Sequence, residues 1–222
     1  MPVSYDSPAD PATAPHGAAL RHVGGPAVLK ILIAGGFGVG KTTTVGAVSE
    51  IEPVSTEEYL TQASAPTDSL DGVETKKTTT VAFDFGRISF DLPIPMELML
   101  FGTPGQDRFI ESLWYDLASG AVGAVVLADT RRLETSFDVV TFCERARLPF
   151  IVAVNEFDGA HRYPVNEVRQ AFALSIHIPV VTFDARVSTS VAKVLLRLVD
   201  HALSQITADP THPTAPTLMD AR

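Results

Sequence analysis

The residues best suited to chemistry stand in one short segment, residues 35–42, which reads GGFGVGKT. Its glycines allow tight backbone turns, so successive N–H groups can converge on phosphate oxygens. Lys41 is spaced to reach the β- and γ-phosphates of a nucleotide, and Thr42 to offer its hydroxyl to the accompanying Mg²⁺. The pattern predicts a phosphate-binding loop, and the alternative is an ordinary glycine-rich turn. The expected nucleotide contacts here are Gly35, Gly36, Gly38, Val39, Gly40, Lys41, Thr42 and Thr43.

The elements on either side of this loop are those that such a site requires. Residues 28–34, VLKILIA, form an apolar run that is rich in β-branched residues and too short for a long helix, which predicts a buried strand. A helix is expected from Lys41 to about Glu50, before Pro53. The positive end of that helix would then face the phosphates.

Further along the chain, apolar strand patterns alternate with helical patterns. Such alternation implies right-handed crossovers and a mainly parallel sheet with helices on both faces. The fold class expected is therefore α/β, a P-loop domain with six strands. Gly86 marks a possible bulge, Pro93 and Pro95 a hairpin turn, and residues 51–79 a long loop. Strands are expected at 28–34, 80–92, 97–101, 122–128, 150–154 and 180–183, and helices at 41–50, 109–119, 133–147, 165–174 and 190–206.

Four polar segments leave expected strands at their carboxyl ends. They are residues 35–42, 102–108, 155–158 and 184–186. In open α/β sheets, ligands bind at the carboxyl ends of the strands. The four segments are therefore expected to share one pocket.

The composition limits what such a pocket can serve. The 222 residues, 45% of them hydrophobic, suit one domain with a sizeable core. A formal net charge of −9 argues against a nucleic-acid surface, which needs basic side chains to neutralise phosphates. The single cysteine, Cys143, cannot form an internal disulfide and fits a reducing cytosol.

The two ends of the chain differ from its centre. Residues 1–26 and 207–222 are rich in proline and offer little to bury, so a disordered leader and a disordered tail are expected around a domain at 27–206. No apolar stretch is long enough to cross a bilayer, and neither end carries a lipidation signal. A cytoplasmic protein is expected, with any membrane contact made through a partner.

Taken together, residues 28–205 resemble the Ras-like small GTPase domain. The runs LFGTPGQDRF at 100–109 and DTRRL at 129–133 look like the bacterial members encoded in actinobacterial conservon operons, which are similar to the gliding-motility GTPases. The resemblance implies binding of GTP, GDP and Mg²⁺. It also implies that Thr80 caps Mg²⁺ and the γ-phosphate, and that Gly105 and Gln106 contact that phosphate and orient the attacking water.

The base-reading loop of that family, N-K-x-D, is matched at its outer positions by Asn155 and Asp158. By this resemblance Asp158 would accept from guanine N1–H and the 2-amino group, donors that adenine does not present in that arrangement. The family's lysine is Glu156 here, and residues 184–186, DAR, stand where the family has S-A-K, so Ala185 would donate to guanine O6. Alone, this loop would also fit an ordinary polar turn. The nucleotide contacts implied by the resemblance are Thr80, Gly105, Asn155, Asp158, Ala185 and Arg186.

One departure from the family concerns the metal. Gly102 stands where the eukaryotic branch has an aspartate that holds a Mg²⁺-bound water, and the gliding-motility relatives also lack it. Mg²⁺ would then be bound chiefly by Thr42 and Thr80, phosphates and waters, and Gly102→Asp would be expected to strengthen the dependence on Mg²⁺. If the metal is held otherwise, Asp84 and Asp129 are the nearest carboxylates to suspect.

The expected function is a molecular switch that hydrolyses GTP slowly. Gln106 would position the water while Lys41, Mg²⁺ and the loop amides absorb charge. Residues 51–80 and 102–112 would be ordered by the γ-phosphate and released on its loss. Candidates for a charge-stabilising arginine are Arg108, Arg131 and Arg132, although each also fits a solvated arginine at a helix start.

The resemblance also implies partners and leaves rival functions open. Conservon GTPases act in a signalling complex beside a sensor-kinase-like membrane protein and a Roadblock-type regulator. One rival is a P-loop kinase or ATPase acting on a small substrate, although no arginine-rich lid segment is found. The other is a non-hydrolysing nucleotide-binding scaffold, which Gly102 and Glu156 favour.

Overall fold

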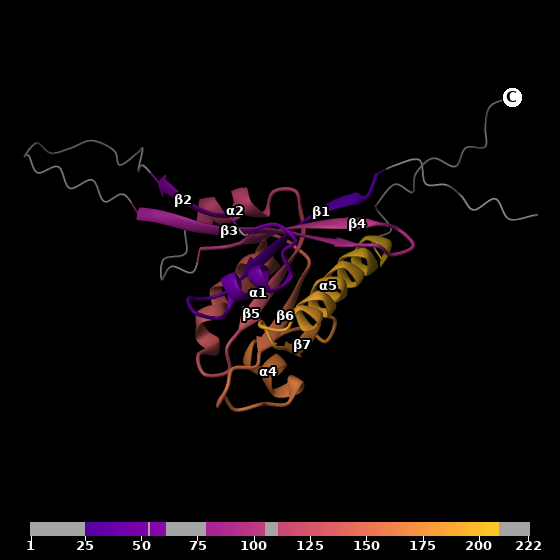
Figure 1. Ribbon diagram of the computed structural model, residues 1–222. Helices are drawn as coiled ribbons and strands as arrows, with labels where there is room; N and C mark the ends of the chain where they lie inside the picture. Colours follow the sequence, from indigo (N-terminus) through magenta and orange to yellow (C-terminus); the bar gives the residue numbers. More distant parts are fainter. Residues whose placement is uncertain (1–24, 53, 61–78, 105–110, 209–222) are drawn as a thin grey trace, which may run out of the picture.

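The computed structural model describes residues 25–52, 54–60, 79–104 and 111–208 (Figure 1). The expected leader and tail fall almost entirely outside these residues, so the domain limits stay predictions. The strands are β1 (Ala27–Ala34), β2 (Val54–Leu60), β3 (Thr79–Phe90), β4 (Met96–Gly102), β5 (Ala121–Ala128), β6 (Phe150–Asn155) and β7 (Val180–Phe183). The helices are α1 (Lys41–Val48), α2 (Glu111–Ala118), α3 (Phe137–Arg145), α4 (Val165–Ala171) and α5 (Ser188–Ala208), with a 3-10 turn η1 (Leu133–Ser136) before α3.

The seven described strands form one sheet in the order β2-β3-β4-β1-β5-β6-β7. β1 pairs in parallel with β4 and β5, and the parallel ladder continues through β6 to β7, whereas β2, β3 and β4 pair antiparallel. The expected α/β class is confirmed, but the count of six strands is wrong. Residues 54–60, expected to be part of a loop, form β2 at the edge of the sheet. Their sequence, VSTEEYL, is too polar to show an apolar strand pattern, and backbone pairing with β3 defines the strand.

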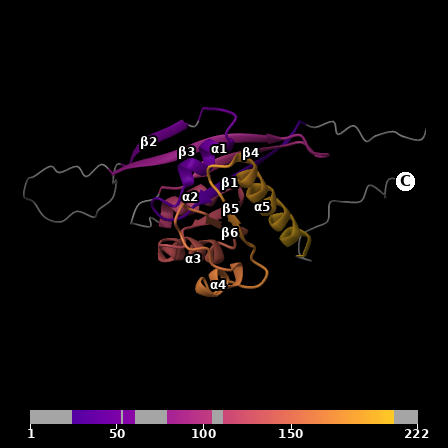
Figure 2. The ribbon, with the colours of Figure 1, turned by 60° about the horizontal axis from the view of Figure 1, so that its bottom comes forward.

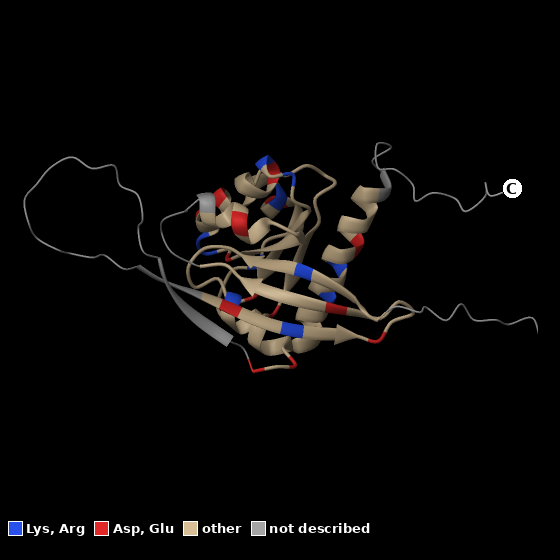
Figure 3. Ribbon diagram, turned by 90° about the horizontal axis from the view of Figure 1, so that it is seen from above, with Lys and Arg blue, Asp and Glu red and all other residues tan. Residues whose placement is uncertain are grey.

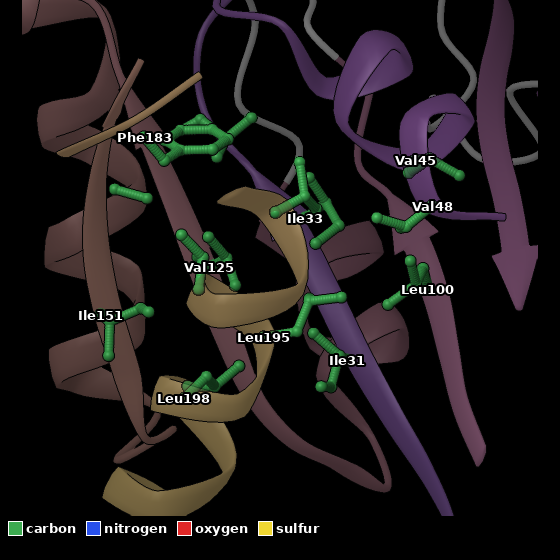
Figure 4. Packing of buried hydrophobic residues seen from close by; sticks show 14 of the residues in the cluster. Ile31, Ile33, Val45, Val48, Leu100, Val125, Ile151, Phe183, Leu195 and Leu198 are labelled. Carbon is green, nitrogen blue, oxygen red and sulfur yellow. The ribbon is translucent and has the colours of Figure 1, made fainter. Parts of the chain in front are cut away.

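Helices cover both faces of the sheet. Successive side chains of a strand point to opposite faces, and the apolar side chains of the central strands need cover on both. On one face Ile31 and Ile33 of β1 share a core with α1 and α5, and on the other Leu32 and Ala34 share a core with α2, α3 and α4. Figure 2 places α5 and α3 on opposite sides of the central strands. Figure 4 shows Leu195 of α5 beside Ile31 in the first core. Burial on both faces explains why the parallel strands read as continuous apolar runs.

The expected hairpin of β3 and β4 is confirmed, and Asp84 faces Gly102 across the two strands. The bulge expected at Gly86 is wrong, because the ladder between these strands runs through Gly86 without a register shift. Gly86 serves packing instead: a Cβ there would lie 2.6 Å from Val45 Cγ1 of α1. The missing side chain lets α1 lie close to β3.

Helix boundaries differ from the expected ones by a few residues. α1 ends at Val48, and the helix expected at 133–147 is divided into η1 and α3. α3 ends at Arg145, shortly before Arg147, whose φ of 51° is left-handed and cannot continue a helix. Cys143 is buried in α3, and burial raises the pKa of its thiol to about 12, so this cysteine packs as a small hydrophobe.

Two properties of the described residues concern the surface of the molecule. None of their helices is both long enough and apolar enough to span a bilayer. Figure 3 shows lysines and arginines interspersed with acidic residues over the described elements. The described elements thus show no extended basic surface in this view, so a phosphate group would have to be bound by a local site.

Candidate functional site

The loop between β1 and α1 has a backbone that its glycines permit. Gly35, Gly38 and Gly40 have φ values of 140°, 74° and 104°, a region that residues with a Cβ rarely adopt. At Gly36 an added Cβ would lie 2.4 Å from the Cβ of Thr135 in η1. The loop leads directly into the amino terminus of α1, where backbone N–H groups favour an anion.

Lys41 begins α1, and its side chain folds back over the loop. Its Nζ donates to the carbonyl oxygens of Gly35 at 2.9 Å and Gly36 at 2.6 Å, and the residue is 8% exposed. Burial lowers the pKa of the Lys41 ammonium to about 8, against the opposing effect of the Asp84 carboxylate. The ammonium is held by neutral carbonyls, which the charged oxygens of a phosphate can replace as stronger acceptors.

Thr42 and Asp84 bring two oxygen donors together beside this loop. Thr42 Oγ1 donates to Asp84 Oδ2 at 2.6 Å. An added Cβ at Gly102, on the neighbouring strand, would lie 2.9 Å from Asp84 Cβ and 3.2 Å from Oδ2. The space that a side chain at position 102 would take is thus filled by a carboxylate from β3.

Hydroxyl and carboxylate oxygens are the donors that Mg²⁺ accepts, so Thr42 and Asp84 fit this metal. No group of three or more His, Cys, Asp or Glu able to hold a metal ion occurs among the described residues. Mg²⁺ binds to nucleotide sites through one or two protein side chains, phosphates and waters. The pair of Thr42 and Asp84 therefore fits a magnesium ion that a nucleotide brings to the site.

Asn155 joins the loops that follow β1, β6 and β7. It is 4% exposed, its Nδ2 donates to the Val39 carbonyl at 3.2 Å, and its Oδ1 accepts from the Ala185 N–H at 3.0 Å. Segments 35–42, 155–158 and 184–186 therefore meet at the carboxyl ends of the parallel strands, as expected. The Ala185 N–H donates to Asn155 in this structure, so the Asn155 side chain ties these loops together, and the expected donation from Ala185 to guanine O6 stays a prediction.

Asp158 is exposed, and its carboxylate is paired with Arg186. Arg186 Nη1 donates to Asp158 Oδ2 at 2.7 Å and Nη2 to Oδ1 at 3.1 Å. The same guanidinium donates to Asp184 through Nε at 2.9 Å and Nη2 at 2.8 Å. These bonds lower the pKa of Asp158 and hold that of Asp184 at about 2. Both carboxylates are therefore ionised at neutral pH.

The two adjacent arginines after β5 have different surroundings. Arg131 Nη2 lies 2.7 Å from Oδ2 of the buried Asp129, whose pKa it lowers, and its guanidinium lies 4.2 Å from the ring centre of Phe157. Arg132 Nη2 donates to the Phe37 carbonyl of the phosphate-binding loop at 3.1 Å. Arg131 is thus paired with Asp129, whereas Arg132 contacts the loop between β1 and α1.

Other expected site residues are placed only in part. Thr43 is exposed in the first turn of α1. Thr80 lies in β3 opposite Tyr59, with only its backbone described. Glu156, in place of the family's lysine, lies 3.5 Å from Arg162 Nη2. The residues expected to act in hydrolysis, Gly105, Gln106 and Arg108, lie outside the described residues.

Sequence reasoning assigned Asp84 only a secondary role and missed the pairing of Asp184 with Arg186. A signal for Asp84 existed, because Pro93 stands midway between positions 84 and 102. A hairpin centred on that proline sets Asp84 opposite Gly102, as observed. Asp184 had no comparable signal, because its side-chain bonds depend on how two loops approach each other.

Comparison with known protein families decides the family. A sequence profile described as "Conserved hypothetical ATP binding protein" matches residues 33–205. The chain belongs to this family. The match begins in β1 and ends in α5, so it includes every loop of the site described above. This member of the ATP-binding family is therefore a nucleotide-binding P-loop protein.

Two solved structures from T. maritima share the fold of this ATP-binding family member. The G domain of the FeoB iron transporter has a TM-score of 0.56 at 18% identity, covering 79% of this chain and 99% of that one. The cytosolic domain of FeoB in a GDP form has a TM-score of 0.58 at 18% identity, covering 81% of this chain and 65% of that longer one. Curated proteins yielded no match. At such identity the likeness establishes the fold alone, which is that of a P-loop GTPase domain.

Proposed function

We propose that this protein is a molecular switch that binds guanine nucleotides with Mg²⁺ and hydrolyses GTP slowly. The observation that carries the choice of base is Asp158, an ionised carboxylate on the loop after β6, three residues after Asn155. A carboxylate only accepts hydrogen bonds, so it matches a base edge with two adjacent donors, N1–H and the 2-amino group of guanine. Adenine presents an acceptor at N1, which a carboxylate repels.

In the proposed site the chain's own residues divide the work. Lys41 and the loop amides would hold the β- and γ-phosphates, where preorganised donors stabilise developing charge. Thr42 would bind Mg²⁺, and Asp84 would orient a water of its shell. When bound, the metal neutralises phosphate charge. Gln106 would orient the attacking water, and Arg132, held at the loop by the Phe37 carbonyl, is the better placed of the two described arginine candidates.

A second candidate function is an ATPase or P-loop kinase, which the description of the family favours because it refers to ATP. A third, a scaffold that binds nucleotide without turnover, is favoured by Glu156 in place of a lysine. The geometry of Asp158 weighs against ATP, because a carboxylate pairs poorly with adenine. The Thr42 and Asp84 pair fits Mg²⁺ in a GTPase and in a non-hydrolysing scaffold alike, so phosphate release is the property that separates these two functions.

The resemblance to conservon GTPases supports a cytoplasmic signalling role. It points to a Roadblock-type regulator and a membrane sensor-kinase-like protein as partners, and to membrane recruitment through one of them. Co-purification of the three proteins in the presence of GTP or GDP would test this role. Binding that does not depend on the nucleotide would contradict a switch.

The proposed activity is tested by titrating the purified protein with fluorescent GTP, GDP and ATP, with and without Mg²⁺, and by measuring phosphate release. We expect GTP and GDP to bind more tightly than ATP and phosphate to be released slowly in Mg²⁺. Preference for ATP would support the ATPase or kinase. Tight binding of GTP without phosphate release would support the scaffold.

A further inference from the structure

Arg186 uses two edges of its guanidinium on two different carboxylates. Nη1 and Nη2 donate to the two oxygens of Asp158, at 2.7 and 3.1 Å. Nε and Nη2 donate to the two oxygens of Asp184, at 2.9 and 2.8 Å. Two-pronged pairs of this kind match the planar fork of the guanidinium to the carboxylate. Arg186 therefore bridges the loop after β6 and the loop after β7.

Asp158 is the residue proposed to read guanine, so a role for Arg186 at this carboxylate rests on the proposed function. Guanine N1–H and the 2-amino group would make a two-pronged contact with the same carboxylate. A carboxylate has one open edge on which both oxygens accept from a planar pair of donors, and Arg186 occupies that edge. Arg186 and guanine therefore compete for Asp158.

Asp184 lowers the cost of that competition. An arginine displaced from Asp158 can keep both bonds to Asp184, whose side chain is 26% exposed against 86% for Asp158. The backbone N–H of Arg186 also donates to Asp184 Oδ1 at 2.9 Å, which anchors this pair at its backbone end. We infer that Arg186 is a specificity gate that covers Asp158 until guanine displaces it, and that Asp184 holds the displaced arginine.

The gate predicts opposite effects for two substitutions. Arg186→Ala leaves Asp158 to guanine alone, so the preference for guanine should rise, by up to about fivefold if this exposed pair behaves like others. Asp184→Ala leaves Arg186 with Asp158 as its carboxylate partner, so the preference should fall by a similar factor. In the double variant the effect of Asp184→Ala should vanish, because no arginine remains to be held.

The experiment compares the Kd of GDP with that of ADP for the wild type, both single variants and the double variant. Adenine has an acceptor at N1 and no 2-amino group, so it cannot make the two-pronged contact with Asp158, and the ratio of the Kd of ADP to the Kd of GDP reports that contact. Effects of an altered net charge on the phosphates cancel in this ratio. The matched control is Arg145→Ala, an exposed arginine at the end of α3, which leads back to the start of β6 and away from the site.

Opposite shifts of the ratio in the two single variants, with the double variant equal to Arg186→Ala, would support the gate. A ratio in Arg186→Ala that equals the wild-type ratio or is smaller would overturn the gate. The arginine would then have no effect on guanine binding or would favour it. If neither the wild type nor Arg186→Ala prefers GDP to ADP, the guanine proposal itself is wrong and the gate falls with it. A preference for GDP that emerges only in Arg186→Ala would support both.

Discussion

Asp84→Ala should weaken the binding of the Mg²⁺ ion that helps to retain the nucleotide. The substitution removes a carboxylate that accepts from the Thr42 hydroxyl at 2.6 Å. Side chains that orient a metal's ligands are typically worth 10- to 100-fold in metal affinity. The Mg²⁺ concentration needed to slow GDP release should therefore rise about 10- to 100-fold, which corresponds to about 1.4–2.7 kcal/mol.

Position 102 offers a rescue that distinguishes this role from a general loss of structure. Gly102→Asp alone should not strengthen Mg²⁺ dependence, contrary to the expectation from sequence, because its Cβ would lie 2.9 Å from Asp84 Cβ. It would also bring two like charges together, at about 4 kcal/mol for unit charges 4 Å apart at an effective dielectric constant of 20. The exchange Asp84→Gly with Gly102→Asp removes both conflicts and should recover Mg²⁺ dependence.

The assay follows the release of labelled GDP across a Mg²⁺ titration for these variants. Asp91→Ala, at the far end of the same hairpin, is the control for loss of one carboxylate. We expect the curves of the wild type, the control and the exchange variant to lie together, with Asp84→Ala displaced to higher Mg²⁺. A folded Asp84→Ala whose curve coincides with the wild type would refute the role of this carboxylate.

Two further predictions concern the basic residues at the loop. The pKa of Lys41 is lowered from 10.5 to about 8, so as the pH rises the folded chain loses this proton before the unfolded chain does. GDP affinity should therefore fall about tenfold between pH 7 and pH 9, because the neutral amine no longer attracts the phosphates. Over the interval from about pH 8 to 10.5 the unfolded chain binds more protons than the folded one, so the unliganded protein should gain stability as the pH rises. Binding titrations at several pH values check this, with Lys41→Arg as the variant whose profile should be flat; parallel profiles would contradict it. Arg132→Ala should slow single-turnover GTP hydrolysis, on the order of 100-fold if it acts like other preorganised donors, with little change in Kd. Equal hydrolysis rates in the wild type and Arg132→Ala would exclude Arg132 as the charge-stabilising arginine. Arg131→Ala should instead lower the thermal unfolding temperature, because it leaves the buried Asp129 carboxylate without its partner.

Much of the fold was predictable, because periodicity and chain order reflect burial directly. The short strand at 180–183 was predicted with its observed bounds, since it is an apolar run between turn residues. β2 was not, because an edge strand with polar side chains carries no apolar pattern and is defined only by its pairing with β3.

The candidate site divides in the same way. The phosphate-binding loop could be predicted because its functional residues are neighbours in sequence. The contact between Thr42 and Asp84 depends on strand register, and the bonds of Arg186 depend on the approach of two loops. Arg131 and Arg132 are identical in type and adjacent in sequence, and only the folded structure shows that one contacts Asp129 and the other the Phe37 carbonyl.

The measurement that tests the central claim most directly is a comparison of GTP and xanthosine triphosphate binding to the wild type and Asp158→Asn. An asparagine can donate to the 2-oxo group of xanthine but cannot accept from two donors, so its preference should reverse. We expect Asp158→Asn to weaken GTP binding by about 1.5–3 kcal/mol, the range for a charge-assisted hydrogen bond, and to improve xanthosine triphosphate binding. Unchanged affinities for both nucleotides in a folded Asp158→Asn protein would remove Asp158 from the site and contradict the assignment of guanine.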